Sequence, residues 1–145
     1  MKRLVIAVAL VAVLARGVAA CSCLPTPFRP MFDRSTAVFR GWVIASTYFG
    51  PSGSHSMGRT VVVLRVTEAW KGVRSDALVS INAGGSGSMC GYSFVRGHEY
   101  LVYADPCGSG RVELCTNSCT RTTGVAGASA DLDSLGLMAK VSRGR

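Results

Sequence analysis

The sequence lacks the motifs that carry the common enzymatic and metal-binding chemistries. It contains no HExxH pair, no G-x-S-x-G turn and no phosphate-binding loop. No C-x-x-C pair is present, and the two histidines, His55 and His98, stand alone without a second histidine at ligand spacing. These absences predict a protein that is not an enzyme and binds no cofactor.

No hydrophobic run in the sequence is long enough to span a bilayer. The apolar run Leu4–Ala15 has twelve residues, whereas a spanning helix needs about twenty. Residues 1–3 (MKR) place positive charge before this run, and the small residues Gly17–Ala20 follow it. This order is typical of a secretory signal peptide. We therefore expect residues 1–20 to be removed, so that a secreted, extracellular protein begins at Cys21.

Long runs of basic residues are also missing. The chain has 16 basic and 8 acidic residues, a net charge of +8. Three of the basic residues lie in the leader, which leaves a net charge of +5 after cleavage. The remaining lysines and arginines are scattered, so a solvated basic surface explains the charge better than a nucleic-acid site does. We expect no nucleic-acid partner.

What the sequence does have is cysteine, and all of it lies after the predicted cleavage site. The six cysteines occupy positions 21, 23, 90, 107, 115 and 119. An even number of cysteines in a small exported domain predicts three disulfides rather than a zinc site. Cys107 and Cys115 flank a Gly-Ser-Gly turn, so a bridge across a hairpin fits this pair.

The two N-terminal cysteines need partners elsewhere in the chain. Cys21 and Cys23 are separated by one residue, and a bridge between them would close a strained small ring. In an extended segment both point to the same face, while Ser22 points outward. The partners left are Cys90 and Cys119, in an order that this reasoning leaves open. Either order would pin the N-terminus through two long covalent loops.

Short strands separated by turns dominate the mature chain. Apolar residues alternate most clearly in Thr60–Trp70 (TVVVLRVTEAW), which predicts a strand with one buried face. Gly41 interrupts another apolar stretch, as at a bulge. The predicted strands are Thr36–Tyr48, Thr60–Trp70, Ala77–Ile81, Glu99–Ala104 and a short fifth strand within 107–115.

Two helices are expected to flank the strands. The prolines of the N-terminal segment limit the first helix to the residues between Pro30 and Ser35. The second covers Asp131–Lys140, where apolar residues recur at helical spacing. These elements predict a mainly β domain over 21–140, a disulfide-stapled, five-stranded OB-like β-barrel, followed by a disordered tail at 141–145.

Four short motifs follow one another along the chain: CSCLP at 21–25, WKG at 70–72, MCGY at 89–92 and TNSCT at 116–120. Their order and spacing resemble those of tissue inhibitors of metalloproteinases (TIMPs) and netrin-like domains. The resemblance implies an OB-like barrel with the pairings Cys21–Cys90 and Cys23–Cys119, to which Cys107–Cys115 would be a local addition. The third cysteine of animal TIMPs, shortly after C-x-C, is missing. We expect no second cysteine-rich domain, so the chain resembles the single-domain bacterial form.

The resemblance also implies that the protein is a secreted inhibitor of a zinc metalloprotease. In TIMPs the free α-amine and the carbonyl oxygen of the first cysteine chelate the target's zinc, so Cys21 would bind zinc only in trans. An α-amine with an ordinary pKa near 8 keeps a neutral fraction at neutral pH, and a catalytic zinc keeps an open position. The protein is expected to act as a monomer. The residues expected to contact the protease are Cys21, Ser22, Cys23, Leu24, Pro25, Ser88 and Met89.

Two alternatives remain at this point. Residues 18–21 (VAAC) also fit a bacterial lipobox, in which a lipid on Cys21 would tether the protein to the membrane at the cell surface. Lipidation would leave one cysteine unpaired, and no polar tether follows Cys21, which favours a free N-terminus. The second alternative is a netrin-like binding or scaffold module without a protease target.

Overall fold

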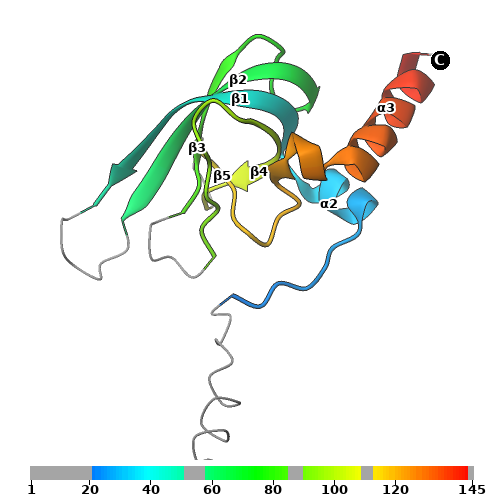
Figure 1. Ribbon diagram of the computed structural model, residues 1–145. Coiled ribbons are helices and arrows are strands. Elements are labelled where there is room, and N and C mark those ends of the chain that lie inside the picture. The colour runs from blue at the N-terminus through cyan, green and yellow to red at the C-terminus, as the bar shows by residue number, and fades with distance from the viewer. Residues whose placement is uncertain (1–20, 51–57, 85–89, 109–112, 144–145) are drawn as a thin grey trace, which may run out of the picture.

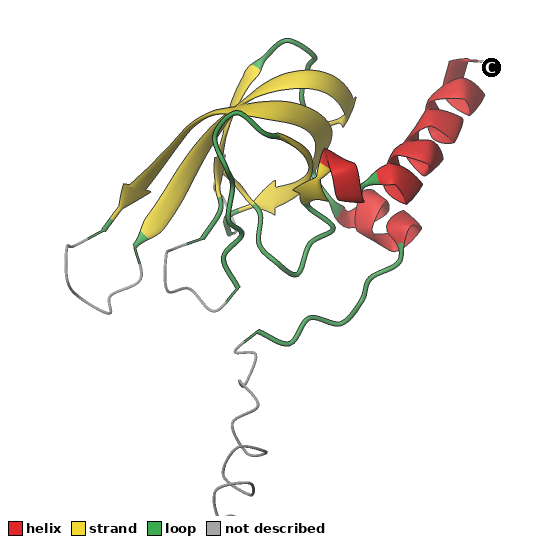
Figure 2. Cartoon of the chain, viewed as in Figure 1, coloured by secondary structure: helices red, strands yellow, loops and turns green. Residues whose placement is uncertain are grey.

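The computed structural model describes residues 21–50, 58–84, 90–108 and 113–143. Within these ranges the chain forms one sheet that closes into a ring, with two α-helices packed beside it (Figure 1). Strands and loops make up most of the chain, as Figure 2 shows. The prediction of a mainly β protein with one helix near each end is therefore confirmed.

The ring is built from antiparallel neighbours and one parallel pair. Its strands are β1 (Ala37–Phe49), β2 (Arg59–Lys71), β3 (Leu78–Asn82), β4 (Glu99–Pro106), β5 (Leu114–Cys115) and β6 (Thr123–Gly124). Strand β1 pairs with both β2 and β4, which closes the ring β1-β2-β3-β5-β4. Strands β3 and β5 form the parallel pair, and β6 pairs with β4.

Five of these strands lie where the sequence predicts them, and the sixth does not appear in the prediction. Strand β6 contributes only two residues, too few to show an alternating pattern, and tertiary pairing with β4 defines it. The predicted bulge is present, because the register of β1 against β2 shifts between Arg40 and Gly41. A Cβ on Gly41 would lie 2.8 Å from the backbone oxygen of Arg65, so glycine allows this close approach.

Alternation along β1 and β4 divides the apolar side chains between two cores. Phe39 and Val102 belong to the cluster that fills the ring, together with residues of β2 and β3. Their neighbours Val38, Leu101 and Tyr103 belong to a second cluster, on the side where the helices lie. The helices thus cover the outer face of β1 and β4 and anchor the segments at both ends of the domain.

Both helices are longer than the sequence predicts. Helix α2 (Phe28–Arg34) begins before Pro30, because a proline in the first helical turn lacks only an N–H that has no partner there. A 3₁₀ turn, η1 (Val125–Gly127), precedes helix α3 (Ser129–Arg143). Helix α3 extends into the predicted tail at 141–145, of which residues 144–145 lie outside the described residues.

Neither α2 nor α3 combines the length and apolarity needed to cross a bilayer.

The WKG motif has a structural role at the end of β2. Gly72 has a φ of 73°, and a Cβ at this position would overlap the backbone oxygen of Thr36. The ammonium group of Lys71 donates hydrogen bonds to the carbonyl oxygens of Phe32 (3.0 Å) and Asp33 (2.8 Å) in the last turn of α2. The motif therefore joins the sheet to α2.

A disulfide joins the two ends of the segment between β4 and β5. Cys107 and Cys115 are bonded, with Cα atoms 4.9 Å apart, as their places around the Gly-Ser-Gly turn predict. This bridge joins the end of β4 to β5, which lies between β3 and β4 in the ring. It therefore stabilises the point at which the ring closes.

Candidate functional site

Two disulfides fasten the extended segment 21–27 to the rest of the domain. Cys21 is bonded to Cys90 and Cys23 to Cys119, with Cα atoms 5.5 and 5.1 Å apart. These are the pairings that the resemblance to TIMPs implies. The bonded residues are separated by 69 and 96 positions in the sequence, so one short segment is tied to two distant parts of the chain.

The two N-terminal bridges touch each other. The Sγ atom of Cys21 lies 3.5 Å from that of Cys119 and 3.8 Å from that of Cys23. Three sulfur atoms from two bridges therefore gather within 4.8 Å of one another. Cysteine binds metal ions as the thiolate, and all six cysteines are bridged. In this oxidised form the three sulfur atoms belong to bridges that tie the N-terminal segment to the domain, and they are not a metal ligand set.

One short loop supports both bridges. The backbone N–H and the hydroxyl of Ser118 donate hydrogen bonds to the carbonyl oxygen of Cys90, at 2.9 and 3.2 Å. The side-chain oxygen of Asn117 accepts a hydrogen bond of 2.8 Å from the backbone N–H of Cys119. The TNSCT motif thus places the partner of Cys23 directly beside the partner of Cys21.

The residues between and after the two N-terminal cysteines face solvent. Ser22 and Pro25 are exposed, and Leu24 leaves 88% of its surface accessible. Cys21 and Cys23 therefore point toward the domain while Ser22 points away, which is the alternation expected of an extended segment. Ser88 and Met89, the other residues predicted to contact a protease, lie outside the described residues.

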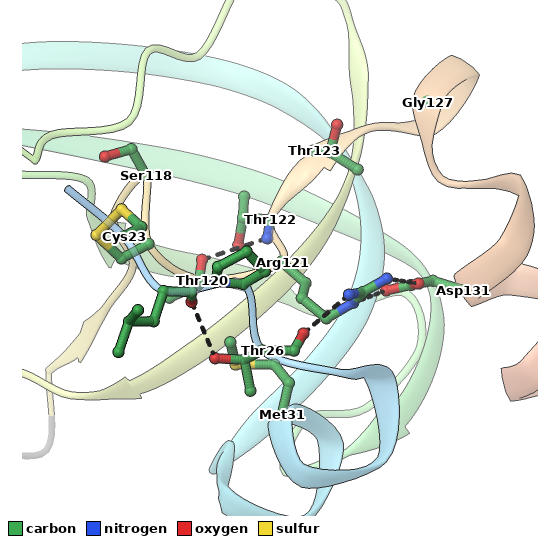
Figure 3. Close-up of a pocket in the computed structure, with 13 residues that line it drawn as sticks. Cys23, Thr26, Met31, Ser118, Thr120, Arg121, Thr122, Thr123, Gly127 and Asp131 are labelled. Atoms are coloured by element: carbon green, nitrogen blue, oxygen red, sulfur yellow. Dashed lines mark hydrogen bonds and ion pairs between the residues drawn. A yellow bond between two sulfur atoms is a disulfide. The ribbon is translucent and has the colours of Figure 1, made fainter. Parts of the chain in front are cut away.

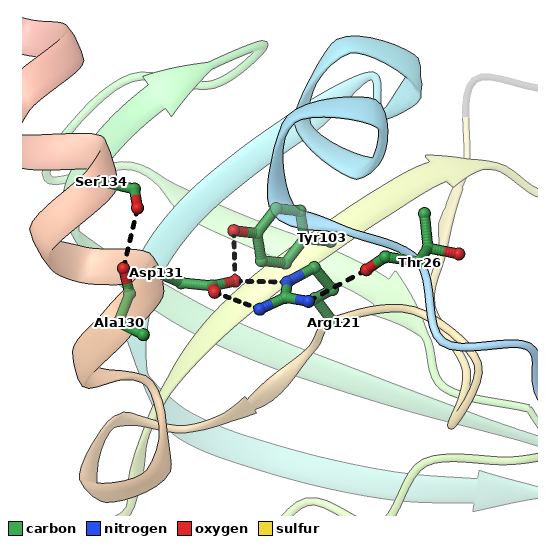
Figure 4. A network of polar contacts seen from close by, with 6 residues as sticks. All are labelled: Thr26, Tyr103, Arg121, Ala130, Asp131 and Ser134. Atoms are coloured by element: carbon green, nitrogen blue, oxygen red, sulfur yellow. Dashed lines mark hydrogen bonds and ion pairs between the residues drawn. The ribbon is translucent and has the colours of Figure 1, made fainter.

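A polar network that the sequence did not predict fastens the end of the segment to the body of the domain (Figure 4). Arg121 donates a hydrogen bond of 2.9 Å to the carbonyl oxygen of Thr26. Its guanidinium also forms a two-pronged ion pair with Asp131, through Nε at 2.8 Å and a second contact through Nη2. Tyr103 on β4 donates a further hydrogen bond of 2.7 Å to the same carboxylate. Strand β4, helix α3 and the N-terminal segment therefore meet at Arg121.

The network fixes the charges of its members. Burial tends to raise the pKa of the Asp131 carboxyl, but hydrogen bonds from Arg121 and Tyr103 outweigh burial and hold this pKa below its ordinary value. The hydrogen bond to Asp131 raises the pKa of the Arg121 guanidinium. Burial, together with the bond to Asp131, raises the pKa of the Tyr103 hydroxyl. At neutral pH the group is an ion pair with a neutral phenol.

A hollow on the described surface lies beside the segment (Figure 3). It has a volume of about 380 Å³, and its walls are the N-terminal segment, the loop 118–123 and Asp131. Two of its hydroxyl groups are engaged within the protein, since those of Thr120 and Thr122 lie 3.0 and 2.8 Å from the hydroxyl of Thr116. The hollow therefore lies where the N-terminal segment meets the loop 118–123.

Sequence reasoning located the bridged cysteines but missed Tyr103, Arg121 and Asp131. The only local signal for this network is Asp131 itself, an acidic residue at the start of the helix predicted over Asp131–Lys140. Such a residue ordinarily indicates a favourable interaction with the helix dipole. Its pairing with Arg121 depends on how the loop 116–123 folds against α3, which no short-range pattern reveals.

The chain was also compared with known families and with curated proteins. It matches no family model and no curated protein.

Proposed function

We propose that the mature protein inhibits a zinc metalloprotease through the free amine and the carbonyl oxygen of Cys21. The observation that supports this proposal is the exposure pattern of a covalently clamped segment. Cys21 and Cys23 are fixed by touching disulfides, while Ser22, Leu24 and Pro25 are turned to solvent. A small domain gains stability from bridges anywhere in its chain. Placing two bridges within residues 21–23 has a further effect, because it makes the N-terminus rigid.

Rigidity of this kind suits a metal-binding group that acts in trans. The amine nitrogen and carbonyl oxygen of one residue close a five-membered ring on a metal ion and would replace the water at the open position of a catalytic zinc. The amine must be unprotonated to bind. An ordinary α-amine has a pKa near 8, so binding at neutral pH releases most of one proton, at a cost of about 1.4 kcal/mol. Because the bridges already order the segment, little conformational entropy is lost on association.

The exposed residues after the first cysteine would extend the contact along the protease cleft. Ser22 would point toward the pocket next to the zinc, because it lies on the opposite face from the two cysteines. Leu24 offers an apolar side chain that the domain itself does not cover. Burying it in a partner would favour association by about 1.5 to 3 kcal/mol. Ser88 and Met89 precede Cys90 and would complete the contact surface. The OB-like barrel that the resemblance implies would serve as the rigid support.

The proposal requires cleavage between Ala20 and Cys21 and no later modification of the amine. Intact mass spectrometry of the exported protein should give the mass of residues 21–145 less the six hydrogens lost in three disulfides. An acyl adduct on Cys21, or a different first residue, would contradict the proposal. It would favour a lipid-anchored or scaffold module instead.

Inhibition is tested directly with two forms of the protein. The mature form and a form with one alanine added before Cys21 are titrated against a panel of zinc metalloproteases. The extension turns the amine into an amide, which cannot chelate zinc, so inhibition should fall by at least about a hundredfold. A serine protease serves as the control and should be unaffected by both forms. Equal potency of the two forms, or no inhibition across the panel, would exclude the mechanism.

A further inference from the structure

The contact between the two N-terminal bridges is asymmetric. The Sγ atom of Cys21 lies against the second bridge, 3.5 Å from Cys119 and 3.8 Å from Cys23. These three atoms form the group that lies within 4.8 Å, and the sulfur of Cys90 is not part of it. If the Cys21–Cys90 bond opened, the sulfur of Cys21 would already be in contact with another disulfide.

We propose that Cys21 and Cys119 form a thiol–disulfide exchange site that a dithiol reductant activates. In the first step the dithiol gives two electrons to the Cys21–Cys90 bond and becomes a disulfide, leaving two protein thiols. In the second step the Cys21 thiolate attacks the sulfur of Cys119. A Cys21–Cys119 bond forms, the Cys23–Cys119 bond breaks, and Cys23 leaves as a thiolate that takes a proton from water. The second step has no net change in oxidation state.

Both geometry and product strain direct the attack to Cys119. It is the nearer of the two sulfur atoms, and attack on Cys23 would create a bridge between residues only two positions apart, which is strained. The similar distances to the two sulfurs mean that Cys21 approaches the bond from the side. Displacement at sulfur needs an approach in line with the breaking bond, and the Cys21 side chain is free to rotate into that line once Cys90 has released it.

The reductant can reach the bridge. Cys21 and Cys90 each keep part of their surface exposed, and so does Cys119. The hydrophobic clusters do not contain any of these residues, so the exchange leaves both cores intact. The Cys107–Cys115 bridge, at the end of β4, lies outside the sulfur group.

The exchange would regulate the N-terminal segment, a consequence that rests on the function proposed above. After exchange, Cys21 is bonded to the loop 116–120 and no longer to Cys90, and Cys23 is released. The amine and carbonyl of Cys21 then lose their fixed position, so reduction by a dithiol would lower inhibition without unfolding the domain.

The exchange is tested by two single variants that leave one free thiol each. Cys90→Ser leaves Cys21 free, and Cys21→Ser leaves Cys90 free. Each protein is incubated at pH 8, alkylated, digested without reduction and analysed by peptide mapping with tandem mass spectrometry, in which fragmentation between Cys21 and Cys23 tells the two cysteines apart. In Cys90→Ser we expect the alkyl label to divide between Cys21 and Cys23, together with a Cys21–Cys119 linked peptide. In Cys21→Ser the label should stay on Cys90. Label confined to Cys21 in the first variant, or equal rearrangement in both, would overturn the proposal.

A second measurement keeps the test valid if a variant folds poorly. The unmodified protein is treated with a limiting amount of dithiothreitol, quenched in acid at intervals and mapped in the same way. The Cys21–Cys119 peptide should appear before the Cys107–Cys115 bridge opens. Its absence at every time point would contradict the exchange. Because this readout is covalent, a positive map with no protease inhibition would refute the proposed function and leave the exchange site standing.

Discussion

At the scale of single residues, Arg121 joins parts of the chain that are far apart in sequence. It donates to the carbonyl oxygen of Thr26 and pairs with Asp131, which also accepts a hydrogen bond from Tyr103. The Asp131 side chain is 7% exposed and that of Arg121 33%, so the pair is only partly screened by solvent. Such a pair matters mainly when one partner is lost, because the other is then left with unsatisfied hydrogen-bonding groups.

Replacing Asp131 by asparagine should therefore destabilise the domain in a pH-dependent way. At pH 7 we expect Asp131→Asn to lower the free energy of unfolding by about 1–2 kcal/mol. The folded state lowers the pKa of this carboxyl. The stabilisation from its charge is thus complete above the unfolded pKa near 4 and disappears as pH falls through the lower folded value. Urea unfolding at pH 7, 5 and 2.5 measures the difference, and a gap that stays constant or widens in acid would contradict this account.

Leu24 is the residue whose role is easiest to separate from stability. With 88% of its surface exposed, Leu24→Ser should leave the urea midpoint unchanged. It should weaken inhibition of a susceptible metalloprotease by about tenfold, the effect of losing roughly half of a buried leucine's contribution. Leu137→Ser is the matched control, since Leu137 is also exposed (64%) but lies on α3. Equal losses of inhibition in both variants would argue against a specific contact by Leu24.

At the scale of elements, the strands and helices that could be predicted are those whose residue pattern extends over many positions. Strand β2 could be predicted because its apolar residues alternate over many positions, and β1 because it is rich in β-branched and aromatic residues. Helix α3 could be predicted because its apolar residues recur at helical spacing. Strand β6 could not be predicted, because pairing with β4 defines its two residues. The start of α2 differs from the prediction because a proline is tolerated in the first helical turn, whereas the sequence pattern indicates a boundary there. At the site, the cysteine motifs identified the bridges, whereas the Arg121 network depends on tertiary folding alone.

Replacing glycine by alanine should change the stability of the domain in opposite directions at Gly72 and Gly136. Gly72→Ala, at the end of β2, should destabilise the domain by at least about 2 kcal/mol, because φ is positive and the new Cβ would overlap the backbone of Thr36. Gly136→Ala, inside α3, should stabilise it by about 0.5–1 kcal/mol, since nothing lies within 4 Å of the new Cβ. Thermal or urea unfolding of the two variants checks both signs. A neutral Gly72→Ala would mean that this close approach is not required.

At the scale of the whole molecule, three disulfides divide into two kinds. The N-terminal bridges close separations of 69 and 96 residues, and the third closes a separation of only 8. Because longer loops lose more entropy in the unfolded chain, each long bridge should contribute about 4–5 kcal/mol and the short one about 2–3 kcal/mol.

Paired serine variants test this difference. Replacing Cys23 and Cys119 together should lower the free energy of unfolding by about 2 kcal/mol more than replacing Cys107 and Cys115 together. Urea unfolding of each variant at pH 7 gives the comparison. If the short bridge proves the more important of the two, the N-terminal bridges would not be serving as the main covalent restraint on the domain.

The central claim is that the Cys21 amine binds a protease's catalytic zinc, and cobalt spectroscopy tests it most directly. A metalloprotease inhibited by the mature protein is prepared with Co²⁺ in place of zinc, and its visible absorption is recorded with the mature and the alanine-extended forms. Replacing a bound water by an amine and a carbonyl oxygen changes the ligands of the metal. We therefore predict a spectral change with the mature form and none with the extended form. An unchanged spectrum while the mature protein inhibits the enzyme, or the same change with both forms, would contradict the claim.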